Sequence, residues 1–242
     1  MRVIVVLVAC LWLYPGVASR AMAGQPVASH LIITDVNPVA FSVVWVASEP
    51  STCTVRLLDE NHRSLADVKV ISESVQHPPA EDLGVMKVRV RGVRPDTNYY
   101  LQTVTTSKKD GKITVYPDKP IPVHTEINTI PVSNSVLAQK IYHNKQLKGN
   151  GSLFIASVEG GSYPVSGWVG DQPNPPSPWT LVDLNNLYSA KTHQNLEVRG
   201  GETLTVEILG GVRGYTRYNS KVPHSSQGGI IELNPPIVLS KP

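Results

Sequence analysis

The chain has 242 residues, and its 22 Lys and Arg residues against 19 Asp and Glu residues give a net charge of +3. Arg2 and Arg20 supply most of that excess, since the first 23 residues contain no acid. The remaining basic residues are spread along the chain, so we do not expect the clustered basic surface of a nucleic-acid-binding protein. The 18 Gly and 20 Pro residues are also spread over the whole length, which argues against long helices.

The first 23 residues have the three-part pattern of an export signal of bacterial type. Met1 and Arg2 give a basic start, residues 3–13 form an uncharged apolar run, and small residues precede Gly24. The run is too short to span a bilayer, which needs about 20 residues. We therefore expect a signal peptide over residues 1–23, cleavage after Ala23, and no stable membrane span.

Lipidation is the alternative for this segment, because residues 7–10 resemble the lipobox of bacterial lipoproteins, in which the cysteine is acylated. The apolar run continues past Cys10, whereas lipoproteins turn polar at once, so ordinary cleavage is preferred. The mature chain then has one cysteine, Cys53, and no internal disulfide. Its phase with Val55 and Leu57 predicts a buried thiol.

From Leu31 onward the hydrophobic period is two, which is typical of half-buried strands. Phe41, Val43 and Trp45 alternate with smaller residues and share one expected buried face. Residues 86–91 alternate in the same way and predict a strand whose outer face is basic, with Lys87, Arg89 and Arg91. Asp110-Gly111 lies between two further strand patterns and predicts a tight hairpin.

Two motifs in the first half resemble a known family. They are Phe41-x-Val43-x-Trp45 and Val93-x-Pro95-x-Thr97-x-Tyr99-x-Leu101, and the second matches the Leu-x-Pro-x-Thr-x-Tyr signature of fibronectin type III domains with Val93 for Leu. The resemblance covers about residues 26–125, within an expected first domain over residues 24–125. It implies that Trp45 fills the core between two sheets and that the Tyr99 hydroxyl bonds to the upstream backbone. The adhesion loop at residues 108–112 lacks an Arg-Gly-Asp tripeptide, so integrin recognition of that kind is not expected.

A Pro-containing linker over residues 126–131 is expected to lead into a second β-rich domain over residues 132–242. Its candidate strands are residues 136–143, 152–158, 165–169, 179–184, 203–209 and 229–233. The patterns Ile141-Tyr142-His143-Asn144, Ser152-Leu153-Phe154-Ile155 and Trp179-x-Leu181-x-Asp183-Leu184-Asn185-Asn186 resemble the carboxypeptidase-regulatory, transthyretin-like group of β-sandwiches. A generic immunoglobulin-like sandwich is the alternative.

The expected fold is thus all-β, with two tandem antiparallel β-sandwiches of immunoglobulin-like type after the signal peptide. The predicted structural core includes Phe41, Val43, Trp45, Tyr99 and Trp179. We place Trp179 in the core because it is in phase with Leu181.

No pattern of catalytic chemistry is present. The seven His residues lack metal-ligand spacing, and the chain contains neither a Gly-x-Ser-x-Gly elbow nor a phosphate-binding loop. Asp171 and residues 183–186 offer oxygens that would suit Ca²⁺, but turn capping is the preferred interpretation. We therefore expect no catalytic residue, no metal and no cofactor.

Three aromatic residues of the second half, Trp168, Tyr215 and Tyr218, lie near turns and are the candidate ligand-binding residues. Core packing of these side chains is the open alternative. The sequence predicts an exported, non-enzymatic binding or structural module, secreted, periplasmic or on the cell surface, whose partner is an envelope or extracellular protein or a polysaccharide. The rival hypotheses are a carbohydrate-binding accessory protein that uses these aromatics, and an enzyme whose site is not visible in the sequence.

Overall fold

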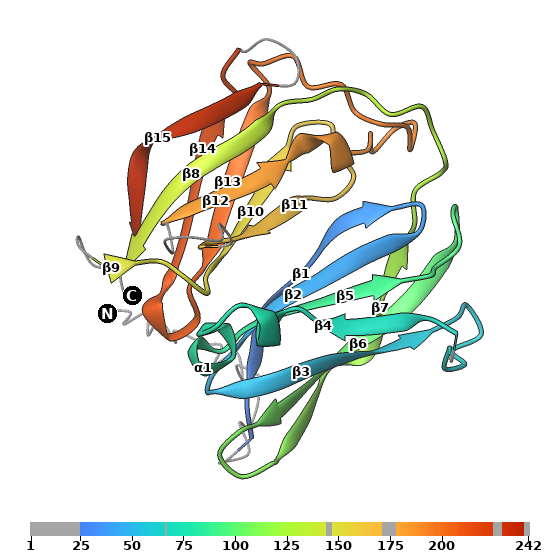
Figure 1. The fold of residues 1–242 in the computed structure, drawn as a ribbon. Helices are drawn as coiled ribbons and strands as arrows, with labels where there is room; N and C mark the ends of the chain where they lie inside the picture. Colours follow the sequence, from blue (N-terminus) through green and yellow to red (C-terminus); the bar gives the residue numbers. More distant parts are fainter. Residues whose placement is uncertain (1–24, 66, 144–146, 171–177, 225–228, 240–242) are drawn as a thin grey trace, which may run out of the picture.

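The computed structural model describes residues 25–65, 67–143, 147–170, 178–224 and 229–239 (Figure 1). The expected cleavage after Ala23, the alternative lipidation at Cys10 and the carboxylate of Asp171 lie outside these residues. Within them the fold is all-β, as the sequence predicts. None of the helices in these ranges has the length and apolar character needed to cross a bilayer.

Seven strands form the first sandwich: β1 (Ala28–Asn37), β2 (Ala40–Ala47), β3 (Ser51–Leu58), β4 (Lys69–Ser72), β5 (Val85–Arg91), β6 (Asn98–Ser107) and β7 (Ile113–His124). One sheet has the order β1-β2-β5-β4 and the other β3-β6-β7. This is the ABED and CFG arrangement of a constant-type immunoglobulin fold. The predicted hairpin at Asp110-Gly111 joins β6 to β7, which pair antiparallel.

The core of this sandwich contains the residues that the sequence placed there. Phe41, Val43 and Trp45 are fully buried, and the Trp45 indole N–H donates to Thr105 Oγ1 at 2.9 Å. The backbone N–H of Arg94 donates to the Tyr99 hydroxyl at 2.8 Å, which is the tyrosine corner implied by the family resemblance.

The second sandwich contains β8 (Val136–His143), β9 (Leu147–Lys148), β10 (Leu153–Val158), β11 (Val165–Trp168), β12 (Trp179–Asp183), β13 (Thr203–Leu209), β14 (Tyr215–Lys221) and β15 (Ile230–Leu239). One sheet has the order β11-β10-β13-β14. The other has the order β12-β8-β15, with the short β9 also paired to β8. Its two outer strands differ in direction, because β12 pairs with β8 antiparallel and β15 pairs with β8 parallel.

The remaining regular elements are short: the 3₁₀ turns η1 (Ser74–Gln76), η2 (Leu184–Asn186) and η3 (Gly211–Arg213), and the helix α1 (Ala80–Leu83). Two of them come together between the sandwiches. Gly211 in η3 has a φ of +59°, and a Cβ placed there would lie 1.8 Å from the carbonyl oxygen of Leu83 in α1. Only glycine therefore permits this close approach.

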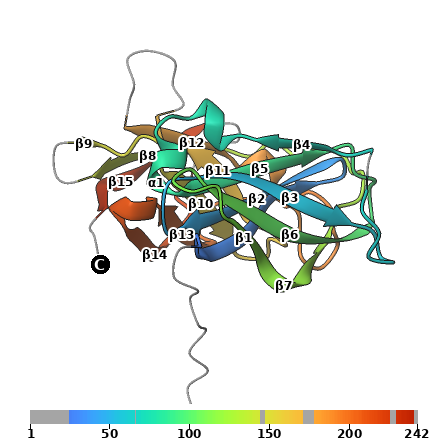
Figure 2. The ribbon, with the colours of Figure 1, turned by 90° about the horizontal axis from the view of Figure 1, so that it is seen from below.

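The two sandwiches pack face to face, so the molecule is a stack of four sheets. A third apolar core, which we call the inter-sandwich core, lies between the β1-β2-β5-β4 sheet and the β11-β10-β13-β14 sheet. Its buried members are Val44, Ala80, Leu83, Val85, Leu153, Ile155, Trp168 and Leu209. In both views β8, β9 and β15 lie at one end of the molecule and β3, β6 and β7 at the other (Figures 1 and 2).

This stacking corrects the prediction of a basic outer face on β5. Lys87 is only 6% exposed, because the second sandwich covers this side of the sheet. Its Nζ lies 3.4 Å from Asp35 and 3.3 Å from Glu73. From the second sandwich, Ser166 donates its backbone N–H and its hydroxyl to the Asp35 carboxylate, at 2.8 Å and 2.6 Å. The charge of Lys87 is thus part of a polar contact between the sandwiches.

Candidate functional site

A cluster of reactive side chains lies where residue 126 leaves the first sandwich. Glu126 is fully buried. The Ser162 hydroxyl donates to Glu126 Oε1 at 2.5 Å, and His193 Nδ1 lies 2.9 Å from Oε2. The His193 ring in turn meets the His124 ring edge to face, with centroids 5.4 Å apart. Sequence reasoning missed this cluster because its members are far apart in the chain and no local motif marks them.

The order of these hydrogen bonds does not suit nucleophilic catalysis. In a catalytic triad the histidine accepts the hydrogen bond of the serine hydroxyl, whereas here the Ser162 hydroxyl is bonded to Glu126. Both ring nitrogens of His124 are also engaged, with Asn98 at 2.9 Å and Asp96 at 3.1 Å. The cluster therefore ties the linker to both sandwiches.

The side-chain oxygens of Asp183 and Asn185, which the sequence offered as calcium ligands, accept backbone hydrogen bonds instead. Asp183 Oδ1 accepts the backbone N–H of Asn185 at 2.8 Å and caps η2. The side-chain oxygen of Asn185 accepts the backbone N–H of Asn134 at 2.6 Å. In the part of the chain that the structure describes, no three His, Cys, Asp or Glu side chains are arranged to hold a metal ion.

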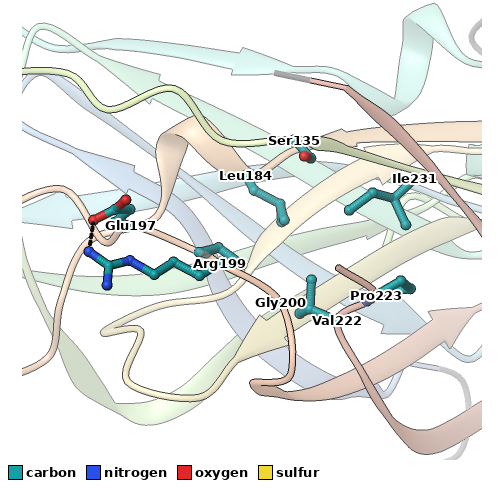
Figure 3. Close-up of a pocket in the computed structure, with 9 residues that line it drawn as sticks. Ser135, Leu184, Glu197, Arg199, Gly200, Val222, Pro223 and Ile231 are labelled. Carbon is teal, nitrogen blue, oxygen red and sulfur yellow. Dashed lines mark hydrogen bonds and ion pairs between the residues drawn. The ribbon is translucent and has the colours of Figure 1, made fainter. Parts of the chain in front are cut away.

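A small pocket of about 210 Å³ opens at the end of the second sandwich where β8 and β15 begin (Figure 3). Leu184, Val222 and Ile231 line it with apolar surface, and the paired side chains of Glu197 and Arg199, 2.8 Å apart, line it with charged surface. Ligand pockets usually have volumes of about 300–1,000 Å³. The volume of this pocket therefore lies below that range.

The three candidate ligand-binding aromatics do not form one surface. Trp168 is buried at 4% exposure in the inter-sandwich core, where its ring stacks on His77 with centroids 4.6 Å apart. Tyr215 lies at the edge of the same core. Tyr218 packs against the internal core of the second sandwich. For Trp168 the alternative of core packing holds, because the first sandwich covers that face of the sheet.

The two tyrosine hydroxyls stay protonated at neutral pH. Burial, together with the hydrogen bond and charge of Glu207, raises the pKa of Tyr215 to about 12. The Tyr215 hydroxyl donates to Glu207 Oε2 at 2.6 Å. Burial alone raises the pKa of Tyr218 to about 12.

The prediction that Trp179 belongs to the core is wrong. The inward face of β12 carries Thr180 and Val182, so Trp179 and Leu181 point outward. Leu181 is 40% exposed. The ammonium of Lys140 lies 4.4 Å from the centroid of the Trp179 ring. The period of two was correct, but the phase of this strand was reversed.

Trp179 and Leu181 belong to a larger surface that sequence reasoning did not find, which we call the outer β8 face. It is the solvent side of the β12-β8-β15 sheet, at the opposite end of the stack from β3, β6 and β7 (Figure 1). The strand registers place these residues on it: Val136, Ala138, Lys140, Tyr142, Trp179, Leu181, Asp183, Ile230, Glu232 and Val238. The sequence of β8 contained one indication of this surface, because apolar residues lie on both faces of the strand for much of its length.

Comparison with known proteins adds little to this picture. No family model matches the chain, and no curated protein matches it. Among solved structures, it is similar to the FN1-FN3 domains of chicken CNTN1, with 12% identity and a TM-score of 0.30, over 89% of this chain and 68% of that chain. A likeness at this level carries no argument about function. The strand order of the first sandwich is that of an immunoglobulin fold. In the second sandwich the first strand, β8, pairs with β12 and β15 and not with β10, so the class is a protein of two packed β-sandwiches, the first of them immunoglobulin-like.

Proposed function

We propose that this chain is an exported, non-enzymatic binding or structural module that acts as one rigid body at the cell envelope or outside the cell. The observation that supports this most is the inter-sandwich core. Two domains joined by a linker normally move relative to each other unless their interface is large and apolar. Here an apolar core and the two hydrogen bonds from Ser166 to the buried Asp35 carboxylate hold them together.

The polar side chains of the junction support the non-enzymatic part of the proposal. Glu126, Ser162 and His193 are bonded to one another in an order that leaves no activated nucleophile. The pocket of Figure 3, at about 210 Å³, is smaller than most ligand pockets and is lined by both polar and apolar side chains. Fold alone does not exclude an enzyme, because function resides in sites rather than in folds.

A protein is the partner that we favour over a polysaccharide. Sugar recognition by this chain was expected to use Trp168, Tyr215 and Tyr218 together, and these side chains belong to two separate cores. The net charge of +3 is small, so long-range steering would contribute little to the choice of partner. Shape and local contacts would have to select it.

Export is tested by fractionating cells that produce the full chain and sequencing the N-terminus of the product. We expect a product outside the cytoplasm that starts at Gly24. A product that stays in the cytoplasm would contradict the proposal. A lipidated product that starts at Cys10 would replace the released form by a lipoprotein.

The binding role is tested by photo-cross-linking in the whole chain, with the reactive residue at Thr54, which is exposed on β3. We expect a discrete cross-linked product in the envelope or extracellular fraction. Ser162→Ala and His193→Gln should leave its yield unchanged, since neither side chain acts as a catalyst. Absence of any product, or a reaction of the purified protein that Ser162→Ala abolishes, would refute the proposal.

A further inference from the structure

We propose that two copies of this chain associate through the outer β8 face, sheet against sheet, about a two-fold axis. This inference concerns a surface that the proposed function does not use, and it stands independently of export.

The outer β8 face exposes large apolar side chains where a solvated sheet normally carries polar ones. Ile230 is 70% exposed, Val238 42% and Leu181 40%. Strand β3 at the other end of the stack provides the comparison, although β7 of the same sheet exposes Ile113 and Tyr116. The exposed positions of β3 are polar, namely Thr52, Thr54 and Arg56.

The shape of the face suits a second sheet. Ala138 lies on the central strand β8, with Leu181 and Glu232 as its neighbours on β12 and β15. Ala138 has only 3% exposure, so its small side chain leaves the middle of the face low. Stacked sheets pack about 10 Å apart, and a small central residue allows that approach.

The charges of the face favour a copy of itself. Lys140 is one basic residue of the face, Lys148 is placed on it by its pairing with Tyr142, and Glu232 and Asp183 are the acids. Lys140 is bonded to Glu232 at 3.3 Å, whereas Asp183 forms no ion pair among the residues that the structure describes. When two faces meet with antiparallel strands, Lys140 of each copy lies over the end of the other face that carries Asp183. A membrane rich in anionic lipids is not favoured, because the two acids of the face balance its two basic residues.

The chain already uses this mode of contact once. Between its own sandwiches, the outer face of the β1-β2-β5-β4 sheet is buried against another sheet with apolar residues such as Val44, Leu153 and Ile155. A two-fold pairing of the outer β8 face repeats that contact between molecules, using the same patch on both. The low net charge of +3 gives little repulsion between copies.

The experiment is sedimentation velocity on the full mature chain over a concentration range of roughly 1–100 μM. We expect a monomer–dimer equilibrium. Leu181→Lys and Ile230→Lys each place an uncompensated charge in the contact and should weaken dimerisation about tenfold or more. Both side chains are exposed in the single chain, so far-ultraviolet circular dichroism and the melting temperature of the monomer should not change.

Ile113→Lys is the matched control, since Ile113 is 55% exposed on β7 at the other end of the stack. It should leave the dimer constant unchanged. Asp183→Asn keeps a side chain that caps η2 but removes the charge, and should weaken the dimer a few-fold and reduce its dependence on salt. A monomer at every concentration overturns the proposal, as does a dimer that Leu181→Lys leaves intact. Binding of the monomer to anionic phosphatidylglycerol vesicles through Leu181 would assign the face to a membrane instead.

Discussion

Removing the charge of Lys87 should destabilise the whole body, because this ammonium neutralises a buried carboxylate at the contact between the sandwiches. Lys87 is 6% exposed and Asp35 9%, and the Lys87 Nζ lies 3.4 Å from Asp35 Oδ2. The substitution Lys87→Met keeps the aliphatic stem and deletes only the ammonium. It leaves Asp35 charged, buried and without its cation.

Breaking a buried ion pair by removing one partner costs about 3–5 kcal/mol. Two hydrogen bonds from Ser166 still stabilise the Asp35 carboxylate, so we expect a loss of stability of about 3 kcal/mol, at the lower end of that range. At roughly 2–4 °C per kcal/mol for a chain of this size, the melting temperature should fall by about 6–12 °C.

The assay is urea unfolding at pH 7, followed by tryptophan fluorescence, together with a thermal melt. Lys69→Met is the matched control, because Lys69 is exposed on β4 and the chemical change is identical; it should alter stability by no more than about 0.5 kcal/mol. The double variant Lys87→Met/Asp35→Asn should lose less than the sum of the two single variants. A loss below about 1 kcal/mol for Lys87→Met would refute the assignment of a buried, energetically coupled pair.

The Asp35 carboxylate should also make the stability of the folded chain depend on pH. Burial raises the pKa of Asp35, but the charge of Lys87 and the hydrogen bonds from Ser166 and Thr34 outweigh it, so the pKa lies below its usual value of 3.8. A carboxylate whose pKa is lower in the folded state contributes its full stabilisation at pH values above its pKa in the unfolded chain. That contribution is lost as the pH falls through its pKa in the folded chain. Stability of the parent should therefore drop below about pH 4, and Asp35→Asn should flatten that part of the curve.

Three further predictions concern single side chains. Gly211→Ala should destabilise the chain by at least about 1 kcal/mol more than Gly111→Ala, because both glycines have positive φ but only Gly211 would meet a neighbouring backbone; equal losses would contradict the close contact of η3 with α1. Tyr99→Phe should cost about 1–3 kcal/mol in urea unfolding, since the Arg94 N–H loses its acceptor, and an unchanged midpoint would exclude that bond. Burial raises the pKa of the Cys53 thiol, so a thiol reagent at pH 8 should modify it only on unfolding; rapid modification of the folded chain would place it at the surface.

The strands were largely predictable from the sequence because the period of two is a local property. Residues 136–143 were expected as one strand and form β8 with the same bounds. The tyrosine corner was implied by the resemblance to fibronectin type III domains, and the Arg94 N–H that donates to Tyr99 lies five residues upstream of it. By contrast, β14 was not expected, and Tyr215 and Tyr218 were assigned to loops because glycines flank that stretch.

The alternating hydrophobic pattern of a strand does not show which sheet, or solvent, covers each of its two faces. Val44 lies on the face of β2 opposite Trp45, and both are fully buried. The same holds for Lys87, which was expected in solvent and lies between sandwiches. For Trp179 the sequence offered two equivalent phases, and the choice was decided by packing against distant strands. The cluster around Glu126 and the outer β8 face are likewise products of tertiary contact.

The face-to-face packing also determines how the protein has to be tested. Cutting the chain near residue 125 would uncover Val44 and Val85 on one half and Leu153, Ile155 and Leu209 on the other. Newly exposed apolar surface of this kind promotes association of the separated halves with themselves or with unrelated proteins. Binding measured on either half would then report the uncovered contact between the sandwiches. Comparisons between point variants of the intact chain avoid this, because they leave the inter-sandwich core closed while changing one outer surface at a time.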